Sequence, residues 1–286
     1  MQYINFNGNI YKESEPLIPV SNRSFRYGDG FFESIAMFQK KFPLLQYHWN
    51  RVMRVAEFLG CRLPGRLNEE SFVQMVLDLA SVNDCVNARV RLQFYRKGGG
   101  FYKPEEDELG YAIEMFPIAH TRFEAGAGIH LGIYPEYKPV SSLSLIKSSS
   151  ALYYVMAAKW CAENGYDECI VANAGYDEVS KSIVPVVSEA ISSNVILPTP
   201  EALFIVSDDE YPVDGVMQEA IIDIFGDEIE IAEAEISEAH LLQAREIWLV
   251  NAVQGIRWVS KFQDVTYTNT LALQYTELLN QRLGLI

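Results

Sequence analysis

The chain has 286 residues, of which 49% are hydrophobic and 12% aromatic, so it can fill one large core or two smaller ones. Its 38 acidic residues outnumber its 23 basic ones, which gives a formal charge of -15 at pH 7. Nucleic acids and anionic membrane surfaces bind clustered basic side chains, so this surplus argues against both as partners. No apolar run is long enough to cross a bilayer, and the first residues lack a signal-peptide pattern. We therefore expect a cytoplasmic enzyme.

The cysteines and histidines show no metal-site pattern. There are four of each, and they are scattered along the chain rather than set at the short spacings of zinc ligands. We expect reduced, mostly buried cysteines and no metal.

The first part of the chain predicts short strands and two amphipathic helices. Asn7-Gly8 between two short runs predicts a β-hairpin, and a glycine-flanked turn at Asp29 precedes an apolar strand. The further predicted elements, in chain order, are a returning strand at 44–47, helices at 48–60 and about 68–81, and strands at 88–96 and 111–116.

The strand at 88–96 alternates with a period of two residues. Arg89, Arg91 and Gln93 share one face, and three apolar residues share the other. Two arginines on one face are either exposed to solvent or directed at an anion.

Residues 119–128 have the composition of a linker. We accordingly expect a small domain at 1–118 and a larger one at 129–286, while residues 173–187 show no regular pattern. The predicted elements beyond the linker are strands at 129–135, 168–172, 194–197, 202–206, 228–231 and 246–250, and helices at 216–225, 237–244 and 270–283.

Lys147 follows an apolar run that predicts the end of a strand. A serine triplet then predicts the start of a helix that ends near Gly165. A lysine with apolar flanks is a candidate for a neutral amine that attacks a carbonyl to form a Schiff base. The alternative is a lysine that packs its stem on apolar surface and keeps its amine in water.

Six segments in order resemble the class IV aminotransferases, a pyridoxal-phosphate-dependent family that includes branched-chain aminotransferases, D-amino acid aminotransferases and aminodeoxychorismate lyases. Each segment alone is a weak signal, but all six in the family's order are a strong one. The matching segments are 25–34 (FRYGDGFFES), 48–51 (HWNR), 146–147 (IK), 188–195 (SEAISSNV), 214–217 (DGVM) and 249–256 (LVNAVQGI).

The resemblance implies a role for each matching residue. Lys147 would be catalytic, forming the Schiff base with pyridoxal 5'-phosphate and moving the substrate's α proton. Glu189 would meet the pyridine nitrogen so that the ring accepts electrons. Arg51 would hold the phosphate together with a helix start. The remaining cofactor-binding residues would be Ser193, Asn194, Gly215, Val216, Met217, Asn251 and Ala252. Arg91 would face a substrate carboxylate, with Tyr27 and Phe32 shaping the pocket.

The resemblance also implies a fold. The family has two domains of mixed α and β structure: a smaller N-terminal α/β domain and a larger C-terminal one with a β-barrel-like mixed sheet. Its active site lies in the cleft between them, and a loop from a second copy completes it, so we expect a homodimer.

Two departures from the family pattern stand out. Gln218 occupies a position where the family often has an arginine after the phosphate-binding turn. Residues 173–187 are longer than the usual connection to the glutamate, which opens an alternative alignment with Glu178 as the pyridine partner. We favour Glu189, because Ser193 and Asn194 follow it at the family's spacing.

The expected function is transfer of an amino group between a small, branched-chain-like amino acid and a 2-oxo acid. The transaminase form of the opening motif, with Glu33, supports it. The first alternative is aminodeoxychorismate lyase, which eliminates pyruvate to give 4-aminobenzoate, and Met217 and Asn251-Ala252 favour it. The second is a degenerate ligand-binding or assembly protein, which Gln218 and the insertion suggest. A structural protein without a small-molecule site is more remote. The sequence does not set the substrate or its chirality.

Overall fold

The computed structural model describes residues 2–178 and 181–286. The chain divides into two compact units, one formed by Met1–Thr121 with Ile146–Ala151 and the other by Arg122–Leu145 with Leu152–Ile286. The short segment that carries Lys147 therefore belongs to the first unit, although the residues on both sides of it belong to the second.

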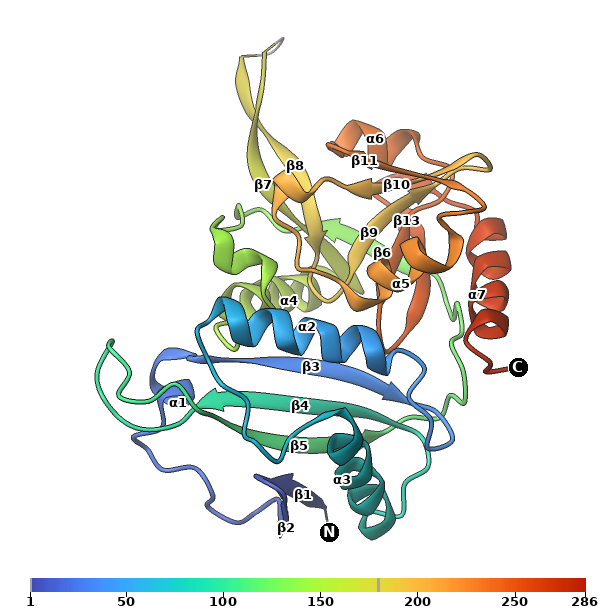
Figure 1. The fold of residues 1–286 in the computed structure, drawn as a ribbon. Coiled ribbons are helices and arrows are strands. Elements are labelled where there is room, and N and C mark those ends of the chain that lie inside the picture. Colours follow the sequence, from blue (N-terminus) through green and yellow to red (C-terminus); the bar gives the residue numbers. More distant parts are fainter. Residues whose placement is uncertain (1, 179–180) are drawn as a thin grey trace. The chain divides into compact units, whose positions relative to one another are not determined.

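The first unit contains a five-stranded antiparallel sheet with the order β2-β1-β5-β4-β3 (Figure 1). The predicted hairpin is confirmed, and its turn residues Asn7 and Gly8 have the positive φ angles, 52° and 91°, that such a turn requires. The strands are β1 (Tyr3–Phe6), β2 (Asn9–Lys12), β3 (Gly30–Met37), β4 (Ala88–Arg96) and β5 (Leu109–Pro117).

Three helices accompany this sheet: α1 (Arg23–Tyr27), α2 (Leu45–Phe58) and α3 (Glu69–Val82). The predicted returning strand at 44–47 is wrong, because α2 already begins at Leu45. A short apolar run fits a helix as well as a strand, and here it continues the apolar face of the helix that follows. The core of the unit is formed by β3, β4 and β5 with α2 and α3, and includes Phe31, Ile35, Val52, Val55, Phe72, Val76, Leu79, Leu92 and Phe94.

The second unit contains a mixed sheet of nine strands. Its main path runs β11-β10-β9-β12-β13-β6-β7-β8, with β14 paired to β13. The pairs β10–β11, β13–β6 and β6–β7 are parallel, and β8 also approaches β9 and β10, so the sheet curls into a half-barrel as expected. The strands are β6 (Ile129–Ile133), β7 (Glu168–Asp177), β8 (Ser182–Ala190), β9 (Asn194–Pro198), β10 (Ala202–Val206), β11 (Glu230–Ala234), β12 (Trp248–Asn251), β13 (Gly255–Phe262) and β14 (Val265–Thr266).

The helices of the second unit confirm the predicted ones closely. They are α4 (Leu152–Asn164), α5 (Val216–Phe225), α6 (Glu238–Gln243) and α7 (Thr270–Arg282). None of the helices in the described ranges is long and apolar enough to span a membrane.

The predicted strand end before Lys147 is wrong. A 3₁₀ turn covers Ser142–Leu145 instead. The Ser141 hydroxyl accepts from the Leu143 amide at 3.2 Å, and the Ser144 hydroxyl accepts from the Ser141 amide at 3.1 Å. Such local serine bonds compete with strand formation.

The irregular stretch at 173–187 forms the outer part of the β7–β8 hairpin, which extends well beyond the rest of the sheet (Figure 1). Ala172 pairs with Val187, and the ladder continues outward to Asp177 and Ser182. Glu178 is exposed in the turn that follows. The insertion is thus a longer ladder. The sequence did not predict it because its outer residues, 174–176 and 182–185, are exposed or half-buried, and only its inner end is packed against the core.

Candidate active site

Lys147 lies beside the edge of the first unit's sheet. Its carbonyl accepts a hydrogen bond from the Phe32 amide at 3.0 Å, and the next residue, Ser148, bridges to Phe31. Ile146 is buried in the core of this unit and anchors the segment. The Lys147 Nζ atom lies 5.1 Å from the centre of the Phe32 ring, within the range of a cation–π interaction.

Arg91 approaches the same aromatic ring from β4. Its guanidinium carbon lies 3.8 Å from the Phe32 ring centre, and its Nη2 donates to Gln93 Oε1 at 2.8 Å. Gln93 in turn donates to the Ser149 hydroxyl at 2.7 Å. The first unit therefore brings together an amine, an aromatic ring and a guanidinium. Gln93, which sequence reasoning had placed on this face without a role, fixes the guanidinium.

Tyr27 packs against Tyr102 in the first unit. Its ring centre lies 5.5 Å from that of Tyr102, and the guanidinium of Arg23 lies 5.3 Å from it on the same helix. The structure places Tyr27 in an aromatic cluster with Tyr102, apart from the contacts that join Phe32 and Arg91.

Arg51 forms a buried ion pair with Glu33. The Glu33 Oε1 atom accepts from Arg51 Nε at 2.8 Å, and Oε2 accepts from Arg51 Nη2 and lies 2.7 Å from His48 Nδ1. All three side chains are almost fully buried, and His48 Nε2 has no hydrogen-bond partner among the described residues. Two nitrogens of the arginine that was expected to hold a phosphate thus face a carboxylate of its own chain.

The Glu33 cluster has strongly shifted titration behaviour. Burial alone would raise the pKa of Glu33, but the charge of Arg51 and the hydrogen bonds from His48 and Arg51 outweigh it and lower the pKa to about 2. Burial lowers the pKa of His48 more than its contact with Glu33 raises it. At neutral pH the cluster is therefore a carboxylate that is paired with a guanidinium and also contacts a neutral imidazole.

Glu189 is the buried acid of the second unit. Its Oε1 accepts from Lys138 Nζ at 2.6 Å and from the Tyr154 hydroxyl at 2.6 Å, and its Oε2 accepts from the Val213 amide at 3.1 Å. Burial, and then the negative charge of Glu189, raise the pKa of Tyr154, so its hydroxyl stays protonated and donates. The other candidate acid, Glu178, is separated from Glu189 by most of β8, roughly 23 Å for seven strand residues.

The start of α5 gathers most of the other predicted cofactor residues. Gly215 precedes the helix and has no capping side chain. Asn194 donates to the Val213 carbonyl at 2.9 Å, and Asn251 donates to the Ser193 hydroxyl at 3.0 Å. Four predicted cofactor residues are buried around this point: Ser193, Asn194, Val216 and Met217. Ala252 follows Asn251 in the same turn and is also buried.

The sequence matches a known family over most of its length. Residues 30–262 match the amino-transferase class IV family. The chain belongs to this family.

Two curated relatives show how wide the class IV aminotransferase family is. D-alanine aminotransferase from Bacillus licheniformis is 21% identical over 258 residues, covering 88% of this chain and 85% of the relative. Aminodeoxychorismate lyase from Bacillus subtilis strain 168 is 24% identical over 270 residues, covering 91% and 87%.

A solved structure shows the same fold. The crystal structure of a branched-chain aminotransferase from the archaeon Thermoproteus uzoniensis with norvaline superposes with a TM-score of 0.85 at 21% identity, covering 99% of this chain and 95% of that one. This member of the class IV family thus shares its fold with a branched-chain aminotransferase.

The start of α5 fits the phosphate of pyridoxal 5'-phosphate. The first amides of a helix have no partner within the helix, and the N-terminal end of the helix dipole favours an anion. A helix start without a capping side chain leaves those amides for a ligand. The glycine is required here, because a Cβ at Gly215 would lie 1.8 Å from Asn194 Oδ1.

Gly215→Ala should displace Asn194 and distort the start of α5. We expect a loss of roughly 1–3 kcal/mol in unfolding free energy, as for other overpacked sites, together with weaker cofactor binding. Chemical denaturation and cofactor titration measure the two effects. Gly65→Ala is the matched control, since its added Cβ meets nothing within 4 Å. Equal stability and affinity in both variants would contradict the fit.

Lys138 and Tyr154 are the residues around Glu189 that sequence reasoning missed. Lys138 has apolar or aromatic neighbours on both sides, the same signal that singled out Lys147. Its partner Glu189 lies 51 residues further along the chain, so no local pattern connects them.

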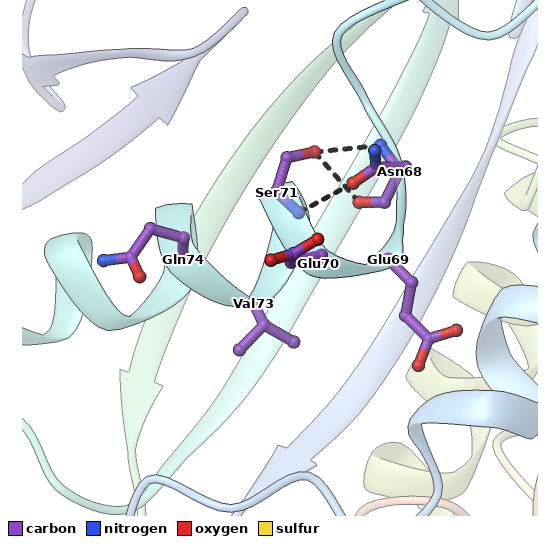
Figure 2. A pocket seen from close by; sticks show the side chains of 6 residues that line it. All are labelled: Asn68, Glu69, Glu70, Ser71, Val73 and Gln74. Atoms are coloured by element: carbon purple, nitrogen blue, oxygen red, sulfur yellow. Dashed lines mark hydrogen bonds between the residues drawn. The ribbon is translucent and has the colours of Figure 1, made fainter.

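A hollow of about 680 Å³ lies at the start of α3 and is lined by residues 68–71, 73 and 74 (Figure 2). There the Asn68 side chain accepts from the Ser71 amide at 2.8 Å, and the Ser71 hydroxyl accepts from the Asn68 amide at 2.9 Å. This capping box already satisfies the amides at the helix start. The hollow therefore lacks the chemistry of the α5 start.

Proposed function

We propose that this class IV aminotransferase binds pyridoxal 5'-phosphate and transfers an amino group between a small, branched-chain-like amino acid and a 2-oxo acid. The observation that carries the proposal is the grouping of Lys147 and Arg91 on the ring of Phe32. It combines an amine that can hold the cofactor aldehyde and move a proton with a guanidinium that can bind a substrate carboxylate.

The bound cofactor would supply an electron sink for the electrons released when the substrate's α C–H bond breaks. Lys147 would take the proton from the α carbon of the substrate and then donate it to the cofactor. Glu189 would accept a hydrogen bond from the pyridine nitrogen. Val216 and Met217 would donate their amides to the phosphate, and Ser193, Asn194, Asn251 and Ala252 would hold that turn in shape. Arg51, which also pairs with Glu33, would add its positive charge to the phosphate site.

The substrate class follows from the side chains beside Lys147. Arg91 offers one cation for a carboxylate, and Phe32 offers an apolar surface for the rest of the molecule. Norvaline, bound in the structurally similar archaeal enzyme, is a small apolar amino acid of this kind. Tyr27 would help to shape the pocket, because the adjacent Gly28 lies so close to the Lys147 segment that a Cβ there would be 3.1 Å from the Ser150 Cα.

Aminodeoxychorismate lyase activity is the second candidate. The Bacillus subtilis lyase aligns with as much of this chain as the D-alanine aminotransferase does. A lyase would use the same Lys147 to remove the α proton before pyruvate leaves. A protein that binds a ligand without turning it over is the third.

Turnover assays separate these candidates. The purified protein is saturated with pyridoxal phosphate and given a panel of L- and D-amino acids with 2-oxo acids, and separately aminodeoxychorismate. We expect amino transfer with small apolar amino acids. Pyruvate and 4-aminobenzoate from aminodeoxychorismate would favour the lyase. Cofactor uptake without any turnover would favour the binding protein, and no uptake would overturn the proposal.

We also propose that the protein is a cytoplasmic homodimer. Leu152, Val155 and Met156 are exposed apolar residues at helical spacing on α4, which is typical of a surface covered by a partner. The four cysteines are unpaired thiols, as in a reducing compartment. Light scattering during gel filtration should give twice the chain mass of 32.4 kDa, and a monomer would contradict the dimer.

A further inference from the structure

Lys138 is a buried lysine with all its donors in use. It follows β6, its backbone amide donates to the Ala172 carbonyl at 2.8 Å, and its side chain is 3% exposed. The ammonium donates to Glu189 Oε1 at 2.6 Å, the Tyr211 carbonyl at 2.6 Å and the Ser188 hydroxyl at 3.1 Å. An ammonium has three N–H donors, so this one is completely satisfied and fixed in place.

A β-bulge in β8 builds this arrangement. Val171 pairs with Glu189, but the next residue of β7, Ala172, pairs with Val187, so Ser188 is an extra residue. Successive residues of a regular strand point to opposite faces, and a bulge changes that alternation. Here it lets the neighbours Ser188 and Glu189 both contact Lys138.

The Glu189 carboxylate has little accepting capacity left. Two donors, Lys138 and Tyr154, occupy Oε1, and the Val213 amide occupies one side of Oε2. A carboxylate accepts about four hydrogen bonds, so one position, on Oε2, remains for a further donor. A cation 2.6 Å from the same carboxylate also offsets much of its negative charge.

We propose that Lys138 is a positioning residue that acts through Glu189. It directs Oε2 towards the pyridine nitrogen of the cofactor and offsets the charge of the carboxylate, so the nitrogen is protonated less than it would be beside an unpaired glutamate. The inference rests on the proposed function, in which Glu189 meets that nitrogen. It implies that the cofactor ring accepts electrons less readily in this chain than it would if Lys138 were absent.

The test compares the holoprotein of the wild type, Lys138→Met, Lys138→Gln and Lys138→Arg. Each is loaded with pyridoxal phosphate carrying ¹⁵N in the ring, and the nitrogen chemical shift is followed against pH. Methionine keeps the length of the stem without the charge, glutamine keeps hydrogen bonding without the charge, and arginine keeps the charge. Removing a nearby cation favours protonation, so the midpoint should rise by about one pH unit in the two neutral variants and stay near the wild-type value in the arginine variant.

The outcomes are distinct. A bound cofactor signal whose midpoint is the same in the wild type and in a folded neutral variant would overturn the role of Lys138, even if that variant is less stable. Lys138→Gln decides the matter if Lys138→Met does not fold. A wild-type protein that takes up no labelled cofactor would overturn the proposed function itself, and with it this inference.

Discussion

Replacing Lys147 with alanine is expected to remove the visible absorbance of covalently held cofactor and nearly all catalytic turnover. The variant loses the amine that holds the aldehyde and the base that moves the α proton, and the loss of general-base catalysis alone is worth roughly 10²–10⁴-fold in rate. The fold should be unaffected, because Ile146 anchors the segment and the Phe32 amide bonds to the backbone of residue 147. Absorbance spectra and single-turnover kinetics measure both effects.

Lys12→Ala is the matched control. Lys12 is the last residue of β2 and is exposed. It should leave the spectrum and the rate unchanged. If the Lys147 variant keeps both the absorbance and the turnover of the wild type, Lys147 is an ordinary lysine and the proposed function fails.

Glu33→Gln is expected to cause the largest loss of stability. It leaves the buried Arg51 guanidinium without its carboxylate, and breaking a buried ion pair costs about 3–5 kcal/mol in unfolding free energy. Chemical denaturation at neutral pH measures the loss. Glu163→Gln is the control, since its pair with Lys159 is mostly exposed and such pairs contribute about 0–1 kcal/mol.

The same cluster predicts acid sensitivity. The folded pKa of Glu33 is about 2 and its ordinary value is 4.5, so the unfolded state binds the proton first as the pH falls. This carboxylate therefore contributes about 3 kcal/mol above pH 4.5, and the contribution disappears between pH 4.5 and pH 2.

His48 acts in the same direction. Its folded pKa is lowered from 6.5, so its contribution to stability falls once the pH drops below 6.5. Between pH 4.5 and pH 2, the unfolding free energy should decline more steeply in the wild type than in Glu33→Gln, which lacks the titrating carboxylate. Parallel curves for the two proteins would contradict the assignment of the acid sensitivity to this cluster.

Local patterns predicted most of the helices. The helix at 216–225 was predicted to the residue, because Gly215 precedes a continuous apolar pattern. The strand β13 was not predicted, although its first residues stand in the matching segment 249–256. The strand β8 was not predicted because only its inner end is buried.

The candidate site residues were easier to propose from the sequence than the residues that contact them. Lys147 and Glu189 stand in recognisable segments, but their surroundings depend on contacts between distant residues. Glu33 and Arg51 are 18 residues apart, and Lys138 and Glu189 are 51 apart. Such pairs form only after the strands and helices have packed, and a single sequence carries no periodic signal for them. Burial of these pairs then determines which predicted site residues already bond to other residues of the chain.

The β-bulge at Ser188 has a consequence for how this chain has diverged. Beyond the bulge, the β7–β8 ladder can lengthen by one residue in each strand. Such an insertion changes neither the position of the residues nearer the sheet nor the face of the sheet to which their side chains point. The bulge itself separates the register of the outer ladder from that of the inner one. Insertions and deletions can therefore accumulate at the hairpin end over evolutionary time while Glu189 keeps its place, so chain length in this region is a poor guide to descent or to activity.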